Sequence, residues 1–120
     1  MQHEQLKAFV LDKIDDMKGR DIVELNVKGK STVTDTMVIC SGNSKRHVSS
    51  IAEHVQVEAK HAGHAPLNVE GKETGDWVLV DLGDIIVHII FEEVAAQPPQ
   101  RATKRKENLM KLSIWNARVL

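Results

Sequence analysis

The sequence predicts an α/β fold in the broad sense of helices packed on a sheet. More narrowly, it predicts an α+β arrangement, in which a mixed β-sheet has its helices mainly against one face. The expected order of elements over residues 1–95 is α-β-β-α-β-β-β. Two amphipathic stretches at helical spacing and one long β-hairpin predict this architecture. With 120 residues, the chain is expected to form one domain that buries about two-thirds of its unfolded surface.

The first half of the chain predicts one helix followed by two strands. Residues 3–18 are expected to form the helix, because apolar side chains recur three and four residues apart until Gly19. Residues 21–27 alternate between apolar and polar, which predicts a strand, and residues 33–40 predict a second strand antiparallel to it. The apolar stripe of the helix consists of Leu6, Phe9, Val10, Ile14 and Met17.

A second amphipathic helix is expected over about residues 45–62. Residues 41–44 have turn chemistry and are expected to end the preceding strand, with Ser44 as the N-cap of the helix. Gly63 suits the C′ position beyond its last turn. A short strand over residues 66–70 then leads into the hairpin. The apolar stripe of this helix consists of Val48, Ile51, Ala52, Val55 and Ala59.

Residues 75–91 predict the hairpin, with Gly83-Asp84 as its two-residue loop. A loop that begins with Gly suits a type II′ turn, because Gly adopts positive φ without a Cβ clash. The loop fixes the register of the two strands, and one face of the hairpin is then wholly aliphatic. We expect this face to be core. Its cross-strand pairs are Leu82 with Ile85, Val80 with Val87, and Val78 with Ile89.

The opposite face of the hairpin mixes large apolar groups with a carboxylate and an imidazole. A fully solvated face would not need Trp, Leu and two Ile residues. Two interpretations stay open: helices bury this face as well, or it is an exposed apolar surface that docks a partner. Its cross-strand pairs are Trp77 with Ile90, Leu79 with His88, and Asp81 with Ile86.

Charge divides the chain into an acidic body and a basic tail. Residues 1–97 carry 10 Lys+Arg against 16 Asp+Glu, whereas residues 98–120 carry 6 against 1. The acidic body argues against nucleic-acid binding by the folded domain, because phosphate contacts need clustered Lys and Arg. It suits a basic protein partner.

A domain boundary is expected at residue 95, so that residues 96–120 form a separate tail. Pro98-Pro99 cannot continue a strand and predicts a linker. Residues 102–115 could form a basic helix, and a docked helix and an undocked tail stay open as alternatives. The apolar residues of that helix would be Leu109, Leu112 and Trp115.

Cysteine usage and hydropathy predict a cytoplasmic protein without a membrane partner. Cys40 is the single cysteine and lies in an apolar run, where we expect a buried structural thiol. The chain has no N-terminal hydrophobic segment. No apolar run approaches the roughly 18 residues of a membrane span.

No catalytic, metal or cofactor site is predicted. His54 and His61 are expected to be surface residues, because two helical turns would separate them by about 10 Å, too far to hold one ion directly. Residues 41–44 could receive a phosphate at a helix start, but they lack P-loop spacing, which favours a helix cap. Asp35 has no neighbouring carboxylate for a two-metal site.

Several separated blocks of sequence follow one another in a specific order. They are residues 35–48 (DTMVICSGNSKRHV), 51–52 (IA), 69–71 (VEG), 77–84 (WVLVDLGD) and 87–88 (VH). With these blocks, about residues 5–92 closely resemble the ribosomal silencing factor family, also called Iojap-related or RsfS proteins.

The resemblance implies a fold similar to nucleotidyltransferases but without their catalytic acids, which agrees with the lone Asp35. It implies a repressor rather than an enzyme: a protein that binds the large-subunit ribosomal protein uL-fourteen and sterically blocks joining of the small subunit when nutrients are scarce. The mixed face of the hairpin then becomes the expected docking surface. Its expected partner-binding residues are Trp77, Leu79, Asp81, Asp84, Ile86, His88 and Ile90.

The chain departs from the family after Phe91, where members usually continue with an acidic, aromatic segment. Here the basic tail follows instead. Two alternatives stay open for it: the tail contacts ribosomal RNA, or it has no role. A monomer or a weak homodimer is expected. Two other function classes also stay open: a nucleotidyltransferase-like enzyme acting through Ser41-Gly42, Ser44 and Asp35, and an interaction module with another partner.

Overall fold

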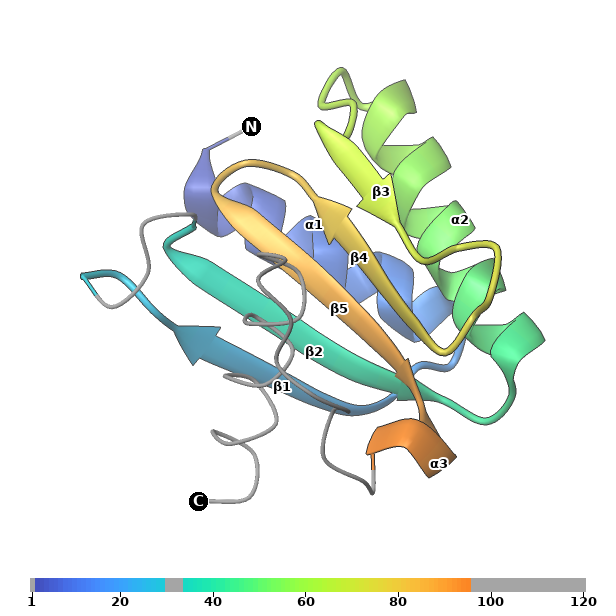
Figure 1. Ribbon diagram of the computed structural model, residues 1–120. Coiled ribbons are helices and arrows are strands. Elements are labelled where there is room, and N and C mark those ends of the chain that lie inside the picture. The colour runs from blue at the N-terminus through green and yellow to red at the C-terminus, as the bar shows by residue number, and fades with distance from the viewer. Residues whose placement is uncertain (1, 30–33, 96–120) are drawn as a thin grey trace.

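A computed structural model describes residues 2–29 and 34–95 of the chain, and the predicted tail lies outside these residues. Five strands form one sheet in the order β1-β2-β5-β4-β3 (Figure 1). Strands β2 and β5 pair in parallel and their other neighbours are antiparallel, so the predicted mixed sheet is confirmed. The elements are α1 (His3–Asp16), β1 (Arg20–Asn26), β2 (Thr36–Gly42), α2 (Lys45–His61), β3 (Asn68–Glu70), β4 (Trp77–Asp81), β5 (Ile85–Phe91) and α3 (Glu92–Ala95).

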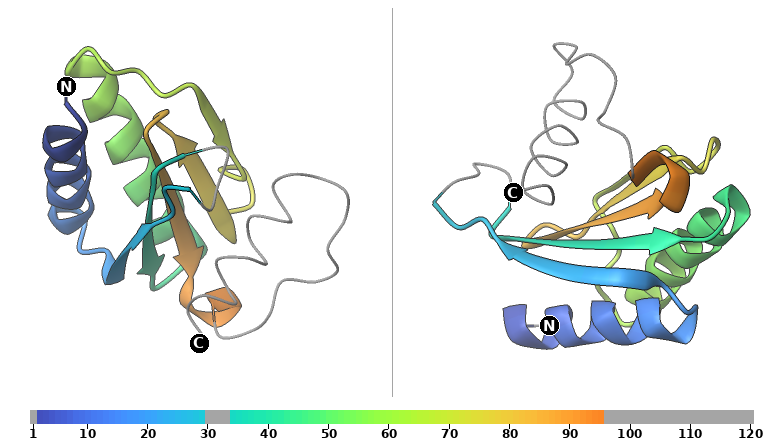
Figure 2. Two further views of the ribbon diagram at one scale, coloured as in Figure 1. Left: turned by 90° about the vertical axis from the view of Figure 1, so that its left-hand side faces the viewer. Right: turned by 90° about the horizontal axis from the view of Figure 1, so that it is seen from below.

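Both long helices lie on the same side of the sheet (Figure 2). The predicted stripe of α1 faces inward, with Leu6, Val10 and Ile14 fully buried. Helix α1 ends at Asp16, two residues before the predicted bound at residue 18, and Lys18 adopts a positive φ of 59° just beyond it. We call the sheet face under α1 and α2 the first face and the opposite one the second face.

Strand β2 is longer than the sequence suggests. It continues through Ser41 and Gly42, so the prediction that residues 41–44 end it after Cys40 is wrong. The reason is tertiary: Ser41 and Gly42 lie opposite Ile90 and Phe91 in the parallel pairing with β5, and this ladder overrides local turn chemistry. Residue 33, the predicted start, lies outside the described residues.

Helix α2 has the predicted caps. The Ser44 side chain accepts a hydrogen bond of 3.0 Å from the backbone N–H of His47, which makes Ser44 the N-cap. At the other end Gly63 has a φ of +79°, and the N–H of His64 donates to the carbonyl of Ala59 at 2.8 Å. This is a Schellman motif, and it satisfies carbonyls that the helix leaves unpaired.

His47 also joins the start of α2 to the end of α1. The backbone N–H of Asn43 donates to Nδ1 of His47 at 2.9 Å, so the proton of the His47 ring is on Nε2. The Nε2–H group donates to the carbonyl of Met17 at 2.7 Å. One neutral imidazole therefore fixes the two helices relative to each other.

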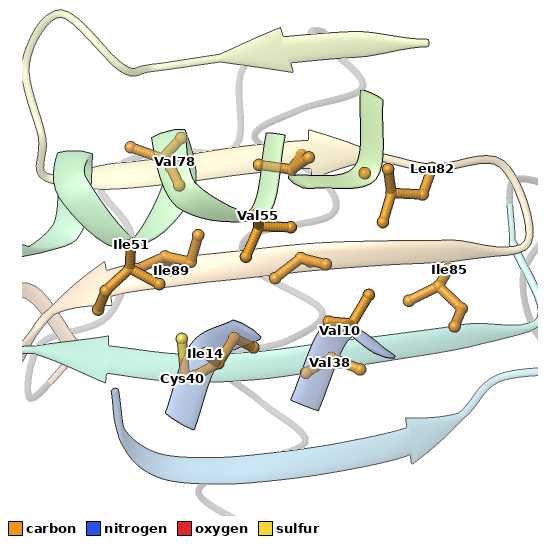
Figure 3. Close-up of a cluster of buried hydrophobic side chains, with 14 of the residues drawn as sticks. Val10, Ile14, Val38, Cys40, Ile51, Val55, Val78, Leu82, Ile85 and Ile89 are labelled. Atoms are coloured by element: carbon orange, nitrogen blue, oxygen red, sulfur yellow. The ribbon is translucent and has the colours of Figure 1, made fainter. Parts of the chain in front are cut away.

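The hairpin of β4 and β5 has the predicted register. The N–H of Leu82 donates to the carbonyl of Ile85 at 2.9 Å, and Gly83 has a φ of +89°, as a type II′ turn requires at its first loop position. The aliphatic face packs under α1 and α2, and Cys40 is buried within the same cluster, as predicted (Figure 3). The aliphatic residues of the hairpin in this core are Val78, Val80, Leu82, Ile85, Val87 and Ile89.

Candidate functional site

The second face of the sheet is apolar in its centre and acidic toward β3. The register places alternate residues of each strand on this face. None of the residues that β2 to β5 place on the second face is Lys or Arg. Arg20, at the start of β1, forms an ion pair of 3.0 Å with Glu92. The second-face positions of β2 to β5 are Met37, Ile39, Ser41, Asn68, Glu70, Trp77, Leu79, Asp81, Ile86, His88 and Ile90.

Trp77 and His88 form a buried polar pair at the centre of this face. The indole N–H of Trp77 donates to Nδ1 of His88 at 2.9 Å, and the two rings meet edge to face at 86°. Trp77 is 4% exposed and His88 is fully buried. Because Nδ1 accepts this hydrogen bond, the neutral imidazole carries its proton on Nε2.

The predicted binding residues divide by burial into two groups. Asp81 is half-buried and Asp84 is exposed in the turn. The side chain of Asp81 accepts a hydrogen bond of 2.9 Å from the N–H of Gly83, so it also braces the turn. The buried group, brought together on the second face, consists of Trp77, Leu79, Ile86, His88 and Ile90.

The sequence reasoning did not include neighbours that β2 contributes. Met37 and Ile39 join Trp77 and Ile90 in one buried cluster, with Leu25, Val27 and Val94 packed against it. The continuous apolar run of this strand from Met37 to Cys40, which is typical of a strand buried on both faces, was a usable signal. Its position beside β5 was not, because parallel strands far apart in sequence have no turn that sets their register.

The alternative enzymatic residues do not form one site. Ser41 is buried within β2, and the hydroxyl of Ser44 is engaged as a helix cap. Asp35 precedes β2 and Ser44 follows it, so the seven residues of the strand, roughly 23 Å at 3.3 Å per residue, separate them. Among residues 2–29 and 34–95, no group of three His, Cys, Asp or Glu side chains could hold a metal ion.

The histidines of α2 have separate environments. His61 is exposed, as predicted, whereas His54 is half-buried and its Nε2 lies 3.1 Å from the Asp16 carboxylate of α1. The hydrogen bond with His54, and then the charge of Lys13, lower the pKa of Asp16 below its usual 3.8. These groups link the two helices on the side of the sheet away from the second face.

Comparison with known proteins decides the family. A family model described as "Ribosomal silencing factor during starvation" matches residues 1–97. The chain belongs to this family. As a ribosomal silencing factor family member, it is 48% identical over 85 residues to "Ribosomal silencing factor RsfS" of Haemophilus influenzae, an alignment that covers 71% of this chain and 83% of the relative. The resemblance seen in the sequence blocks is therefore confirmed.

Solved structures of the family share the fold. A crystal structure of a Chromobacterium violaceum protein matches with a TM-score of 0.74 and 31% identity, covering 91% of this chain and 99% of that one. A more distant relative, "Mitochondrial assembly of ribosomal large subunit protein 1" of Mus musculus, is 32% identical over 78 residues. That match covers 62% of this silencing factor family member and 34% of the mouse protein. No helix in the described parts of the chain has the length and hydropathy needed to cross a membrane.

Proposed function

We propose that this protein is a non-enzymatic repressor of translation that binds the large ribosomal subunit through protein uL-fourteen and sterically blocks joining of the small subunit. The family match over residues 1–97 carries this proposal. The name of the mouse relative, which refers to the large ribosomal subunit, supports the choice of subunit. A cytoplasmic location belongs to the proposal, because the ribosome is the target.

The second face is the proposed docking surface. Trp77 holds its apolar centre together, and because Trp77 is only 4% exposed, a partner would meet first the half-buried and exposed groups around that centre. Carboxylates of Glu70, Asp81 and Asp84 lie at its β3 side and at the hairpin turn. An apolar centre with an acidic rim is complementary to a basic ribosomal protein.

Subunit binding can be tested by co-sedimentation of the full chain with purified large subunits, and subunit joining by light scattering. Asp84→Lys probes the rim, since the Asp84 side chain is exposed and only its backbone carbonyl accepts the hydrogen bonds from Thr34 and Thr36. Asp15→Lys makes the same charge change on the exposed surface of α1. It is the matched control.

We expect Asp84→Lys to weaken large-subunit binding roughly two- to fivefold at low salt, the range of an exposed ion pair, and the loss to shrink as salt rises. Asp15→Lys should bind as the unmodified chain does. Equal losses in both variants would show a general charge effect rather than docking by this rim. No co-sedimentation of the unmodified chain would contradict the proposed function itself.

A further inference from the structure

We propose that Leu67 is a docking residue, whose side chain enters an apolar recess on a basic protein partner beside the hairpin turn of β4 and β5. This inference rests on the proposed function, because the partner is the basic ribosomal protein that would bind the second face. Leu67 adds an exposed apolar contact to that surface, whose own apolar centre is buried.

Leu67 is the most exposed large apolar side chain in the described part of the chain. It is 75% exposed, whereas Val57, Ile22 and Val23 are 40%, 38% and 36% exposed. Trp77 on the second face is 4% exposed and offers a partner far less apolar surface. A single exposed leucine is common on protein surfaces, so exposure alone does not mark a contact residue.

The backbone holds Leu67 in one place. Its N–H donates to the carbonyl of Asp81 at 2.8 Å, one residue before β3 begins beside the end of β4 (Figure 1). Pro66 comes directly before it, and the proline ring fixes φ at that position. An exposed side chain on a fixed backbone loses less conformational entropy on binding than one on a loop that must first be ordered.

The side chain of Leu67 lies against the hairpin turn. A Cβ placed on Gly83 would be 3.7 Å from Cδ1 of Leu67, an ordinary van der Waals distance, so the leucine lies beside the first residue of the loop. The next residue is Asp84, whose exposed carboxylate belongs to the proposed acidic rim. The apolar side chain and the rim are therefore parts of one continuous surface.

The charge around this turn indicates what kind of partner Leu67 meets. Asp84, Asp35 and Glu4 line a polar cavity of about 370 Å³ at this end of the sheet, and Lys28 is the one Lys or Arg among the described residues that line it. An apolar side chain beside such an excess of carboxylates is complementary to a basic protein surface. It disfavours ribosomal RNA as the occupant, because RNA phosphates would be repelled.

Three variants of the full chain isolate this contact. Leu67→Ser removes the apolar side chain and keeps the backbone N–H that donates to Asp81. Val57→Ser is the matched control, because it removes an exposed apolar side chain from α2. Leu67→Met keeps an apolar side chain of similar size and is the rescue variant. Urea unfolding of Leu67→Ser should match that of the unmodified chain, since the side chain is mostly in solvent.

Co-sedimentation with purified large subunits then measures the contact. We expect Leu67→Ser to weaken binding roughly tenfold, the effect of withdrawing one aliphatic side chain from an interface. Leu67→Met and Val57→Ser should bind within about twofold of the unmodified chain. The loss from Leu67→Ser should stay the same as salt rises, because the variant changes no charge, whereas the loss from Asp84→Lys should shrink.

The outcomes that contradict this proposal differ from those that contradict the proposed function. If the unmodified chain co-sediments and Leu67→Ser binds equally well, the role of Leu67 is wrong and the proposed function stands. A loss of binding to large subunits but not to purified uL-fourteen would assign Leu67 to another component of the subunit and overturn the proposal. Reduced self-association of Leu67→Ser in sedimentation equilibrium, with unchanged subunit binding, would mean that a second copy occupies it. If the unmodified chain does not co-sediment, the proposed function fails, and the partner named for Leu67 fails with it.

Discussion

The hydrogen bond between Trp77 and His88 provides the sharpest test of how the second face is held together. Trp77→Phe keeps an aromatic ring but removes the indole N–H that donates to His88 Nδ1 at 2.9 Å. Removing one partner from a buried hydrogen bond costs about 1–3 kcal/mol, because the remaining group stays out of contact with water. We therefore expect Trp77→Phe to lower the free energy of unfolding by about 2 kcal/mol.

A double-mutant cycle isolates this bond from changes in packing. His88→Leu removes the acceptor and is expected to cost a similar amount. In the combined Trp77→Phe and His88→Leu variant both polar groups are replaced by apolar ones, so the total loss should stay well below the sum of the single losses. We expect a coupling free energy of about 1–2 kcal/mol.

Urea unfolding followed by far-ultraviolet circular dichroism measures all variants without relying on Trp77 fluorescence. Val57, 40% exposed on α2, supplies the control: Val57→Ala combined with Trp77→Phe should be additive. Additivity within about 0.5 kcal/mol in the Trp77 and His88 cycle as well would refute the hydrogen bond as a stabilising interaction.

Three further predictions concern the helices and one tight turn. Hydrogen bonding to His54 of α2 lowers the pKa of Asp16 below 3.8. The stabilisation of the fold by ionised Asp16 is therefore present above about pH 4 and is lost as pH falls through the lower native pKa. Asp16→Asn should therefore flatten the acid limb of a stability curve measured against pH, and an unchanged limb would contradict this. Ser44→Ala should cost about 1 kcal/mol in urea unfolding through loss of the N-cap, while Ser50→Ala inside the same helix should not; subunit-joining inhibition should stay within a few-fold in both. Gly71→Ala should lower the melting temperature more than Gly63→Ala, because both glycines have positive φ but only Gly71 would place a Cβ against a backbone carbonyl; equal losses would mean that φ alone decides.

Local features of this protein could be predicted from its sequence. The stripe of α1, the Ser44 cap and the Gly63 terminus each depend on residues within one or two helical turns, and all three are confirmed. The hairpin register is confirmed for the same reason: the loop at Gly83 sets it, and every cross-strand pair follows by counting from that loop. These features need no knowledge of distant contacts.

The tertiary structure alone decided the environment of the second face. Parallel pairing of β2 with β5 joins residues about fifty positions apart and places Ile39 opposite His88. It also extends β2 through Gly42, against the local turn signal. The same packing puts both long helices on the first face and buries Trp77 against His88. Periodicity assigns residues to faces, but which layer covers a face depends on contacts between distant segments, which local patterns do not encode.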